Sequence, residues 1–370
     1  MKVFFAGGGT AGHVNPALAV ASYLRTKDPM CDIAFSGGTG GIEERLVARE
    51  GYKIYTFPIS GLSRSMSLGG IKKNIHAVTD ALSAVKSAKG ILRREKPDIV
   101  IGTGGYACFP MVYAAQSLGI KTAVLEVNAT PGVALKRLAA KADCVMISFE
   151  ETKSFFPGAK RVVYTGSPVR PEMFEERKKP QEPLFDNGKP TVLCFWGSVG
   201  AMYMNKKMEE FISILSADGS FNLLQGAGKA NFQWMPHEIE EKGVDLEHSG
   251  NIRLMEYIYD MGKVMNACDL IICRAGASTL AEVCACGKPS IIIPSPYVAD
   301  NHQEKNARAL ERAGAAKVAL ENEVDGRSLF EMAKAMLADR AALETMGEKA
   351  RLLAREDALE NICQAIKATI

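Results

Sequence analysis

Hydrophobic residues in this chain form short unbroken runs that alternate with longer stretches of helical periodicity. In the first half each run predicts a strand, and each strand is followed by a predicted helix, beginning with Asn15–Lys27. The predicted strands of this half are Val3–Ala6, Asp32–Ser36, Lys53–Phe57, Asp98–Ile101 and Lys121–Leu125. Strands without polar alternation, each followed by a helix, are typical of a parallel sheet that helices cover on both faces.

The rhythm breaks between about residues 157 and 190 and then starts again. This stretch contains six prolines and the charged run Glu175–Lys179, and we interpret it as a linker between domains. Two helical stretches are expected from about residue 327 to residue 370. The later strands are predicted at Thr191–Phe195, Phe221–Leu224, Asp269–Cys273, Ser290–Ile293 and Ala316–Ala319. The pattern therefore predicts an α/β protein with two Rossmann-like, parallel-sheet domains.

Composition adds limits to this picture. A chain of 370 residues with 47% hydrophobic residues can form two cores, and a net charge of +3 does not indicate a nucleic-acid partner. The nine cysteines lie mostly in apolar runs, which indicates buried thiols in a reducing compartment rather than disulfides. The N-terminal apolar run is too short for a signal peptide, and no run is long enough to span a membrane, so we expect a cytoplasmic protein.

A glycine-rich turn with a histidine follows the first predicted strand. Gly7, Gly9 and Gly12 have the spacing of a dinucleotide-binding loop, but no acidic residue closes the second strand, which disfavours NAD. A neutral imidazole at His13 could accept a hydroxyl proton near neutral pH. The alternative is that His13 only caps the helix or bonds to a loop carbonyl.

Further polar and glycine-rich segments follow other predicted strands. Gly102–Tyr106, which contains Gly104 and Gly105, and Asn128 are both expected at the sheet edge where ligands bind in open α/β sheets. Asn128 could instead serve only its turn. In the second half, Gly197 and Ser198 form a similar glycine turn, and Asp300–Glu304 is a polar segment at a predicted helix start.

The segment Arg274–Glu282 predicts a strand, a glycine turn and then a helix that begins at Ser278 or Thr279. A helix start of this kind can hold a diphosphate, and Glu282 could accept hydrogen bonds from a ribose diol. Thr279 and Glu282 also have the spacing of a capping box, which needs no ligand. The sequence has no Asp-x-Asp and no cluster with metal-ligand spacing, so we expect no metal cofactor; helix N-termini and arginines such as Arg170 would neutralise a leaving diphosphate.

Basic residues gather between Gly61 and Lys96, where apolar residues recur at helical spacing. Such a helix can lie on an anionic membrane, although an ordinary surface helix has the same pattern. The basic residues assigned to a membrane face are Lys72, Lys73, Lys86, Lys89 and Arg93. The apolar positions are Ile71, Ile75, Val78, Leu82, Val85 and Leu92.

In this order the motifs resemble those of the MurG family, the N-acetylglucosaminyltransferases of peptidoglycan synthesis. The matching segments are Gly7–Leu18, Gly102–Tyr106, Leu125–Gly132, Thr165–Arg170, Gly197–Ala201, Cys273–Glu282 and Asp300–Gln303. The resemblance covers nearly the whole chain and implies the GT-B fold, in which two Rossmann-like domains face a cleft. It implies an acceptor domain over residues 1–166 with a returning helix at about 355–370, and a donor domain over 167–354.

The resemblance also implies substrates, location and residue roles. The donor is UDP-GlcNAc, the acceptor is lipid I (undecaprenyl-diphosphate-MurNAc-pentapeptide), and the enzyme is peripheral on the cytoplasmic face of the plasma membrane. His13 is the implied base, and Glu282 the implied partner of the ribose. The other implied donor and substrate contacts are Thr10, Ala11, Gly12, Asn128, Arg170, Gly197, Ser198, Ile258, Ala277, Ser278, Thr279 and Gln303. Gly104, Gly105 and Tyr106 form the implied acceptor loop.

Three single residues and one three-residue segment depart from the family pattern. Val127 stands where a glutamine is usual, Trp196 where the third loop usually has a glycine, and Ala11 where a further turn glycine is common; Ala107–Phe109 replaces smaller residues. These departures leave open a glycosyltransferase with another lipid acceptor, such as diacylglycerol. A UDP-GlcNAc epimerase and a UDP-sugar-binding scaffold without turnover also remain open alternatives.

Overall fold

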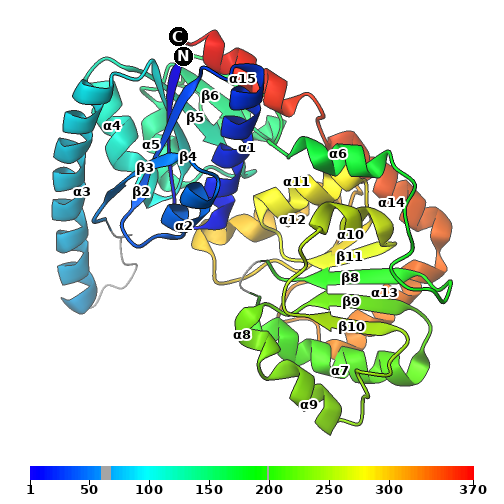
Figure 1. Cartoon of the computed structure of the whole chain (residues 1–370). Helices are drawn as coiled ribbons and strands as arrows, with labels where there is room; N and C mark the ends of the chain where they lie inside the picture. The colour runs from blue at the N-terminus through cyan, green and yellow to red at the C-terminus, as the bar shows by residue number, and fades with distance from the viewer. Residues whose placement is uncertain (60–67, 198–199) are drawn as a thin grey trace. The chain divides into compact units, whose positions relative to one another are not determined.

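The chain forms two compact units, each built on a parallel β-sheet (Figure 1). The computed structural model describes residues 1–59, 68–197 and 200–370, and the side chains of 68–78 lie outside this description. The N-terminal unit contains Met1–Val169 and Asp357–Ile370, and the C-terminal unit contains Arg170–Glu356. The predicted fold class, α/β with two Rossmann-like parallel-sheet domains, is confirmed.

The N-terminal sheet has the strand order β3-β2-β1-β4-β5-β6-β7 over the described residues, with every pairing parallel. Its strands are β1 (Lys2–Gly7), β2 (Asp32–Gly38), β3 (Lys53–Phe57), β4 (Ile99–Gly104), β5 (Lys121–Glu126), β6 (Cys144–Ile147) and β7 (Val162–Tyr164). Its helices are α1 (Ala11–Lys27), α2 (Ile42–Arg49), α3 (Leu68–Glu95), η1 (Tyr106–Cys108), α4 (Phe109–Ser117), α5 (Val133–Ala139), η2 (Glu150–Phe155) and α15 (Ala358–Lys367).

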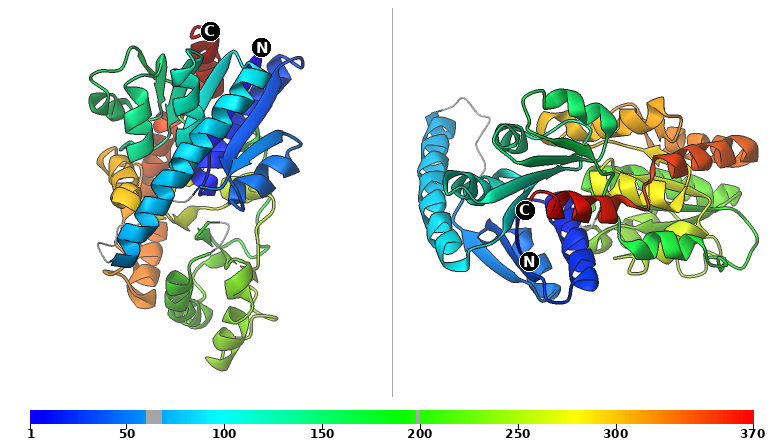
Figure 2. Two further views of the ribbon diagram at one scale, coloured as in Figure 1. Left: turned by 90° about the vertical axis from the view of Figure 1, so that its left-hand side faces the viewer. Right: turned by 90° about the horizontal axis from the view of Figure 1, so that it is seen from above.

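Helices cover both faces of this sheet because its strands are apolar on both sides. Phe4 and Ala6 pack with Leu92 of α3, Met111 of α4 and Leu135 of α5 in one cluster. Alternate strand residues point to the opposite face, where α1 lies against β1 and β4 and α15 returns to pack on α1 and β6. Figure 2 shows α3 as a long helix, and the C-terminal helix α15 lies beside α1.

The C-terminal sheet has the order β10-β9-β8-β11-β12-β13 within the described part of the chain, and it is parallel as well. Its strands are β8 (Thr191–Phe195), β9 (Asn222–Gly226), β10 (Ile252–Met255), β11 (Leu270–Cys273), β12 (Ser290–Ile292) and β13 (Lys317–Val318). Its helices are α6 (Pro171–Arg177), α7 (Met202–Asp218), α8 (Lys229–Phe232), α9 (Met235–Glu241), α10 (Met261–Ala267), α11 (Ala277–Cys286), η3 (Ala299–Asn301), α12 (His302–Arg312), α13 (Gly326–Ala338) and α14 (Arg340–Leu353). Phe211, Phe221 and Phe330 centre its core, with ring centroids 5.5–6.0 Å apart.

Several sequence predictions need correction. The proline-rich stretch 157–190 is not a continuous linker, because β7 pairs with β6 as an edge strand and α6 begins at Pro171, where a proline is well tolerated. The first helix begins at Ala11 rather than Asn15, so Ala11, Gly12 and His13 belong to its first turn. Strands β6, β7 and β10 were not predicted, and three helices rather than two follow residue 325.

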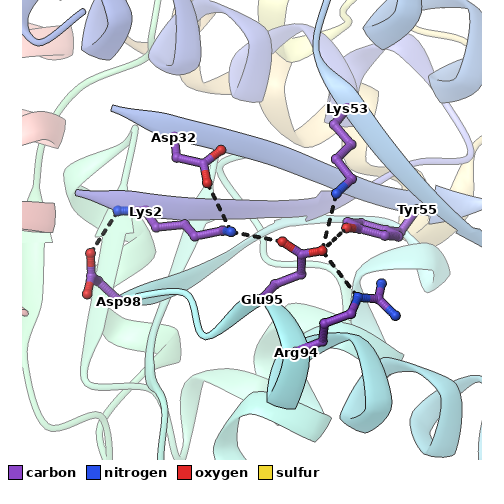
Figure 3. A network of polar contacts seen from close by, with 7 residues as sticks. All are labelled: Lys2, Asp32, Lys53, Tyr55, Arg94, Glu95 and Asp98. Atoms are coloured by element: carbon purple, nitrogen blue, oxygen red, sulfur yellow. Dashed lines mark hydrogen bonds and ion pairs between the residues drawn. The ribbon is translucent and has the colours of Figure 1, made fainter. Parts of the chain in front are cut away.

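The end of α3 is fixed to the edge of the N-terminal sheet by ion pairs (Figure 3). Glu95, the last residue of α3, lies 2.8 Å from the Nζ of Lys2 and 3.2 Å from that of Lys53, and it accepts a hydrogen bond from Tyr55. Asp32 adds a contact of 2.9 Å to Lys2. Hydrogen bonds from Lys2, Tyr55 and Lys53 hold the pKa of Glu95 well below its usual range, with Lys2 the largest contributor.

All nine cysteines are buried and free, so the prediction of buried thiols is confirmed. Burial is also the largest cause of the raised pKa values of thiols such as Cys108, at about 12, and Cys273. These side chains therefore act as small apolar residues of the two cores.

Candidate active site

The first glycine loop ends β1 and leads directly into α1. Gly9 has a φ of +81°, and Thr10 is the extended N-cap residue, although its side chain makes no capping hydrogen bond. The backbone N–H of His13 donates to the carbonyl of Thr10 over 3.1 Å, which closes the first turn. The N–H groups of this turn otherwise lack partners within the helix, as at every helix start.

His13 lies between this loop and the glycine loop after β4. Its Nδ1 is 3.1 Å from the carbonyl oxygen of Gly8 and 3.2 Å from Oγ1 of Thr10. Thr103 of β4 donates to the carbonyl of His13 over 2.8 Å, and Gly8 N–H donates to the carbonyl of Gly104 over 3.3 Å. The two glycine loops of the N-terminal unit therefore form one hydrogen-bonded structure around the imidazole.

Glycine is required in the second loop by both space and backbone conformation. A Cβ on Gly104 would lie 2.5 Å from the ring of His13, and one on Gly105 would lie 2.1 Å from the carbonyl oxygen of Gly8. Their φ angles are +115° and +73°, a region that other residues rarely adopt. Tyr106 follows in η1 with its side chain 44% exposed, and its ring approaches Gly9.

Asn128 is held by a buried carboxylate at the end of β5. Glu126 accepts hydrogen bonds of 2.9 Å from both the backbone and the side-chain N–H of Asn128, and one of 3.1 Å from the backbone of Gly132. Burial raises the pKa of Glu126 to about 7, and these donors act in the opposite direction. The loop Val127–Gly132 is therefore built around Glu126, so Asn128 has a turn role in addition to any ligand role.

The first glycine loop of the C-terminal unit follows β8. Gly197 has a φ of +89° and is exposed, and Gly200 has a φ of +78°. A Cβ on Gly200 would lie 2.3 Å from the carbonyl oxygen of Ala227, so the loop passes close to the end of β9. The predicted contact Ser198 lies outside the described residues.

The helix that follows β11 begins earlier than the sequence suggests. Gly276 is the N-cap, Ala277 is the first helical residue, and Thr279 is inside the first turn. The proposed capping box is therefore wrong, because Thr279 is not at the cap position. Ser278 has a buried Oγ without a hydrogen-bond partner among the described residues.

Glu282 lies one turn further along α11. No described residue donates a hydrogen bond to its carboxylate, and burial raises its pKa to about 7 while the charge of Arg170 acts in the opposite direction. A half-buried carboxylate without a hydrogen-bond donor is costly unless something else supplies one. The helix start thus presents unpaired N–H groups, one unpaired hydroxyl and one unsatisfied carboxylate.

Two further predicted residues, Ile258 and Gln303, lie near the ends of strands of the C-terminal sheet. Ile258 is 5% exposed and packs over Gly226 at the end of β9, where a Cβ would be 3.2 Å from its side chain. Gln303, in the first turn of α12, accepts a hydrogen bond of 2.8 Å from the backbone of Ser295. Arg170, the exposed N-cap of α6, makes no ion pair with another described residue.

Comparison with known proteins places this geometry in a family. Residues 3–147 match the glycosyltransferase family 28 N-terminal domain, and residues 191–362 match its C-terminal domain. The chain is 41% identical over 369 residues to the UDP-N-acetylglucosamine–N-acetylmuramyl-(pentapeptide) pyrophosphoryl-undecaprenol N-acetylglucosamine transferase of Acetivibrio thermocellus, covering 99% of this chain and 98% of that one. The chain belongs to the MurG family.

Solved structures agree with this assignment. The crystal structure of Acinetobacter baumannii MurG has a TM-score of 0.78 and 30% identity, with 99% of both chains covered. A putative UDP-N-acetylglucosamine 2-epimerase from Listeria monocytogenes has a TM-score of 0.68 at 14% identity, covering 99% of this chain and 96% of that one. That second likeness shows the shared GT-B fold alone.

Two of the departures from the MurG pattern are buried. Val127 is 4% exposed in the loop that Glu126 organises, and Trp196 is 5% exposed below the C-terminal glycine loop. The guanidinium of Arg274 lies 5.7 Å from the centre of the Trp196 ring and pairs with the buried Glu321. Trp196 is thus part of the packing of the C-terminal unit at the end of β8.

Sequence reasoning missed three acidic residues of this MurG chain. The buried Glu126 accepts hydrogen bonds from Asn128, and the buried Glu321 pairs with Arg274. Glu43 accepts a hydrogen bond from Gly9 of the first glycine loop. The signal for Glu43 is weak: it follows the glycine-rich turn after β2, but its partner Gly9 is 34 residues away. Among the described residues, no group of three or more His, Cys, Asp or Glu side chains is arranged to hold a metal ion.

Proposed function

We propose that this chain transfers N-acetylglucosamine from UDP-GlcNAc to the C4 hydroxyl of MurNAc in lipid I, giving lipid II for peptidoglycan synthesis. The observation that carries this proposal is the 41% identity over 99% of the chain to a transferase whose name states the donor and acceptor. Direct displacement at the anomeric carbon inverts its configuration and gives a β1→4 bond.

The donor's phosphates and ribose would be held at the start of α11. The N–H groups of Ala277, Ser278 and Thr279 and the positive end of the helix dipole suit a diphosphate. The unsatisfied carboxylate of Glu282 suits the ribose diol, whose hydroxyls would supply the donors that it lacks in the protein. The glycine loop at Gly197 and Ser198 is assigned to the phosphates by the same proposal.

Other residues of the C-terminal unit would bind the rest of the donor. The buried side chain of Ile258 offers an apolar surface to the base, and Gln303 has an amide N–H₂ beside the oxygen that Ser295 already uses. Arg170 keeps its charge at any physiological pH and can neutralise the leaving UDP. We therefore propose that the reaction needs no metal or other cofactor.

The acceptor chemistry would be carried by the N-terminal unit. His13 is proposed to take the proton of the C4 hydroxyl as the new bond to the sugar forms and UDP departs. Thr10, Ala11, Gly12 and Asn128 are the proposed contacts to the sugar or acceptor. Gly104, Gly105 and Tyr106 form the proposed acceptor loop, next to the imidazole.

One assay tests both the transfer reaction and its independence of metal ions. Purified protein is mixed with UDP-GlcNAc and a short-chain lipid I analogue in the presence of EDTA, and UDP release is followed. Release that depends on the acceptor and survives EDTA is expected. Tight UDP binding without release would instead favour a scaffold, and release with diacylglycerol but not lipid I would favour another acceptor.

Two variants test the proposed base and the proposed donor site independently. His13→Ala should lose at least about 100-fold in turnover, the usual scale of general base catalysis, while UDP affinity stays the same. Unchanged turnover in His13→Ala would contradict the assignment of the base. Glu282→Ala is the matched variant of the donor site, since it should weaken UDP binding first.

We propose further that α3 lies on an anionic membrane at the cytoplasmic face of the plasma membrane. Lys86, Lys89 and Arg93 follow Leu82 at spacings of three or four residues, so the four share one side of the helix. Leu82 is 67% exposed, whereas Ala84, Val85 and Ala88 are buried. Of the predicted apolar positions, Val85 and Leu92 are buried in the core of the N-terminal unit, whereas Leu82 is exposed and suits contact with lipid. The side chains of Lys72 and Lys73 lie outside the described residues.

No helix in the described residues is long and apolar enough to cross a membrane. Binding of the chain to phosphatidylglycerol vesicles, compared with phosphatidylcholine vesicles, tests whether it binds an anionic membrane surface. The variant Lys86→Glu/Lys89→Glu should reduce binding at low salt, because each basic residue near the surface contributes about 1 kcal/mol. Equal binding by this variant and by the wild-type chain would contradict the proposal, and Arg137→Glu/Lys141→Glu is the control on other exposed basic residues.

A further inference from the structure

A buried carboxylate lies behind the glycine loop that carries His13. Glu43 is in the first turn of α2 and only 1% exposed. Its Oε1 accepts a hydrogen bond of 2.7 Å from the backbone of Gly38, and its Oε2 accepts one of 3.1 Å from the backbone of Gly9. One side chain thus ties the end of β1 to the end of β2.

The space for this carboxylate is made by glycines. A Cβ on Gly8 would lie 2.1 Å from the Glu43 carboxylate, one on Gly37 would lie 2.3 Å from its side chain, and one on Gly41 would lie 2.5 Å from it. Burial of a carboxylate costs free energy unless hydrogen bonds compensate. Three glycines therefore leave room for a carboxylate where an apolar side chain could be buried at a lower cost in free energy.

The N–H that Glu43 binds belongs to the same peptide group that the imidazole contacts. The Gly8–Gly9 peptide donates its N–H to Glu43 and presents its carbonyl oxygen 3.1 Å from Nδ1 of His13. A carbonyl only accepts hydrogen bonds, so this contact requires a proton on Nδ1. The hydroxyl of Thr10, 3.2 Å from the same nitrogen, can accept as well as donate and is compatible with that tautomer.

We propose that Glu43 is a positioning residue that acts on His13 through the Gly8–Gly9 peptide. A negative charge at the N–H of a peptide polarises it and makes its carbonyl a stronger acceptor, since linked hydrogen bonds reinforce one another. The peptide then does for His13 what a carboxylate does for the histidine of a hydrolytic triad: it selects the Nδ1–H tautomer and stabilises the imidazolium.

This inference rests on the proposed transfer reaction, and it specifies where the proton of the acceptor hydroxyl goes. The acceptor's O–H bond breaks as its oxygen bonds to the anomeric carbon, the proton passes to Nε2 of His13, and UDP leaves with the electrons of the broken sugar–phosphate bond. The imidazolium formed carries protons on both nitrogens, with Nδ1–H directed at Gly8. Ionisable side chains face this loop from two neighbouring elements, Glu43 from α2 and Tyr106 from η1, and the first turn of α1 has no acidic residue.

The first test needs no turnover. Nitrogen NMR of the ¹⁵N-histidine-labelled wild-type chain reports the tautomer of each imidazole, and His13→Ala identifies the signal. The proposal predicts that neutral His13 carries its proton on Nδ1. A proton on Nε2 would overturn it, whatever the enzyme's substrates prove to be.

The second test compares two neighbouring carboxylates. Glu43→Gln keeps the shape but can accept from only one of its two backbone donors, and it removes the charge. Glu44→Gln is the matched control, because Glu44 also accepts from a loop N–H, that of Gly40 over 3.1 Å, but does not touch the Gly8–Gly9 peptide. Both variants lose one negative charge from the start of the same helix.

With UDP-GlcNAc and the lipid I analogue, Glu43→Gln should lower kcat about 10- to 100-fold, the usual loss when the partner that orients a functional histidine is removed. The KM for UDP-GlcNAc should change less than about threefold, by comparison with that loss. The acid limb of the pH–rate profile should move to lower pH, because the imidazolium loses stabilisation. Glu44→Gln should match the wild-type chain in all three.

Equal kcat and an unmoved acid limb in Glu43→Gln would overturn the proposal. If Glu43→Gln fails to fold, the tautomer measurement on the wild-type chain decides the proposal. If the wild-type chain has no turnover but His13 is protonated at Nδ1 and loses that preference in Glu43→Gln, the proposed function fails and the coupling of Glu43 to His13 stands.

Discussion

A comparison of two glycines with similar positive φ angles distinguishes backbone strain from damage to the candidate site. Gly105 has a φ of +73° and Gly119 a φ of +71°, and both lie in the N-terminal unit. A Cβ on Gly119 meets nothing within 4 Å, whereas one on Gly105 would lie 2.1 Å from the carbonyl oxygen of Gly8 and 3.1 Å from Nδ1 of His13. Alanine at a positive φ costs about 1–3 kcal/mol. Gly105 also has a ψ of 165°, a combination that is essentially restricted to glycine, so thermal unfolding of both variants is needed to measure the difference in strain.

Only Gly105→Ala should also damage the reaction. Real Cβ contacts are rarely shorter than 3.0 Å, so the Gly8 carbonyl must move by about 1 Å, a displacement that can cost about 100-fold in rate. The expected result is a kcat about 100-fold lower for Gly105→Ala, with UDP affinity unchanged, and a near-normal kcat for Gly119→Ala. The assay is steady-state UDP release, with thermal unfolding measured for each variant.

A kcat for Gly105→Ala within about threefold of the wild-type value, a difference below about 1 kcal/mol, would contradict this expectation. That result would mean that the Gly8 carbonyl can move without consequence for His13. A similar loss of kcat in both variants would assign the effect to general destabilisation of the unit instead.

Further predictions concern charged groups elsewhere in the two units. Because burial raises the pKa of Glu282 to about 7, the ligand-free chain should lose stability as pH rises from about 4.5 through 7, and Glu282→Gln should flatten this trend in thermal unfolding. The pKa of Glu95 is lowered, so its contribution to stability is present above the carboxylate's ordinary range and lost as pH falls; Glu95→Gln should lower the melting temperature at pH 7 more than at pH 3, and the exposed Glu50→Gln should not. Arg274→Met leaves Glu321 buried without its partner and should cost about 3–5 kcal/mol in chemical denaturation, a loss that Arg274→Met/Glu321→Leu should largely restore.

The sequence predicted those features that depend on local pattern. Apolar runs such as Lys121–Leu125 marked the central strands, because strands buried on both faces contain few polar residues. Short edge strands were missed for the opposite reason: β7 lies among prolines, and β10 contains the exposed Arg253. The helix start at Ala277 was missed because Gly276 as N-cap gives a weaker signal than the hydroxyl of Thr279.

Contacts between distant segments were beyond sequence reasoning. The glycines before Glu43 were visible, but only the fold brings its carboxylate to Gly9. Glu126 lies within the motif Leu125–Gly132, but its hydrogen bonds to Asn128 and Gly132 depend on the path of a loop. Residue types at strand ends thus indicate where a site lies, whereas the buried groups that hold it in place appear only with the structure.

Identification of the product tests the central claim most directly. The chain is incubated with UDP-GlcNAc and a lipid I analogue, and the product is analysed by mass spectrometry and proton NMR. We expect one added N-acetylglucosamine in β linkage to C4 of MurNAc, with one UDP released for each product formed. An unmodified acceptor accompanied by free N-acetylglucosamine, or by the epimerised sugar, would contradict it.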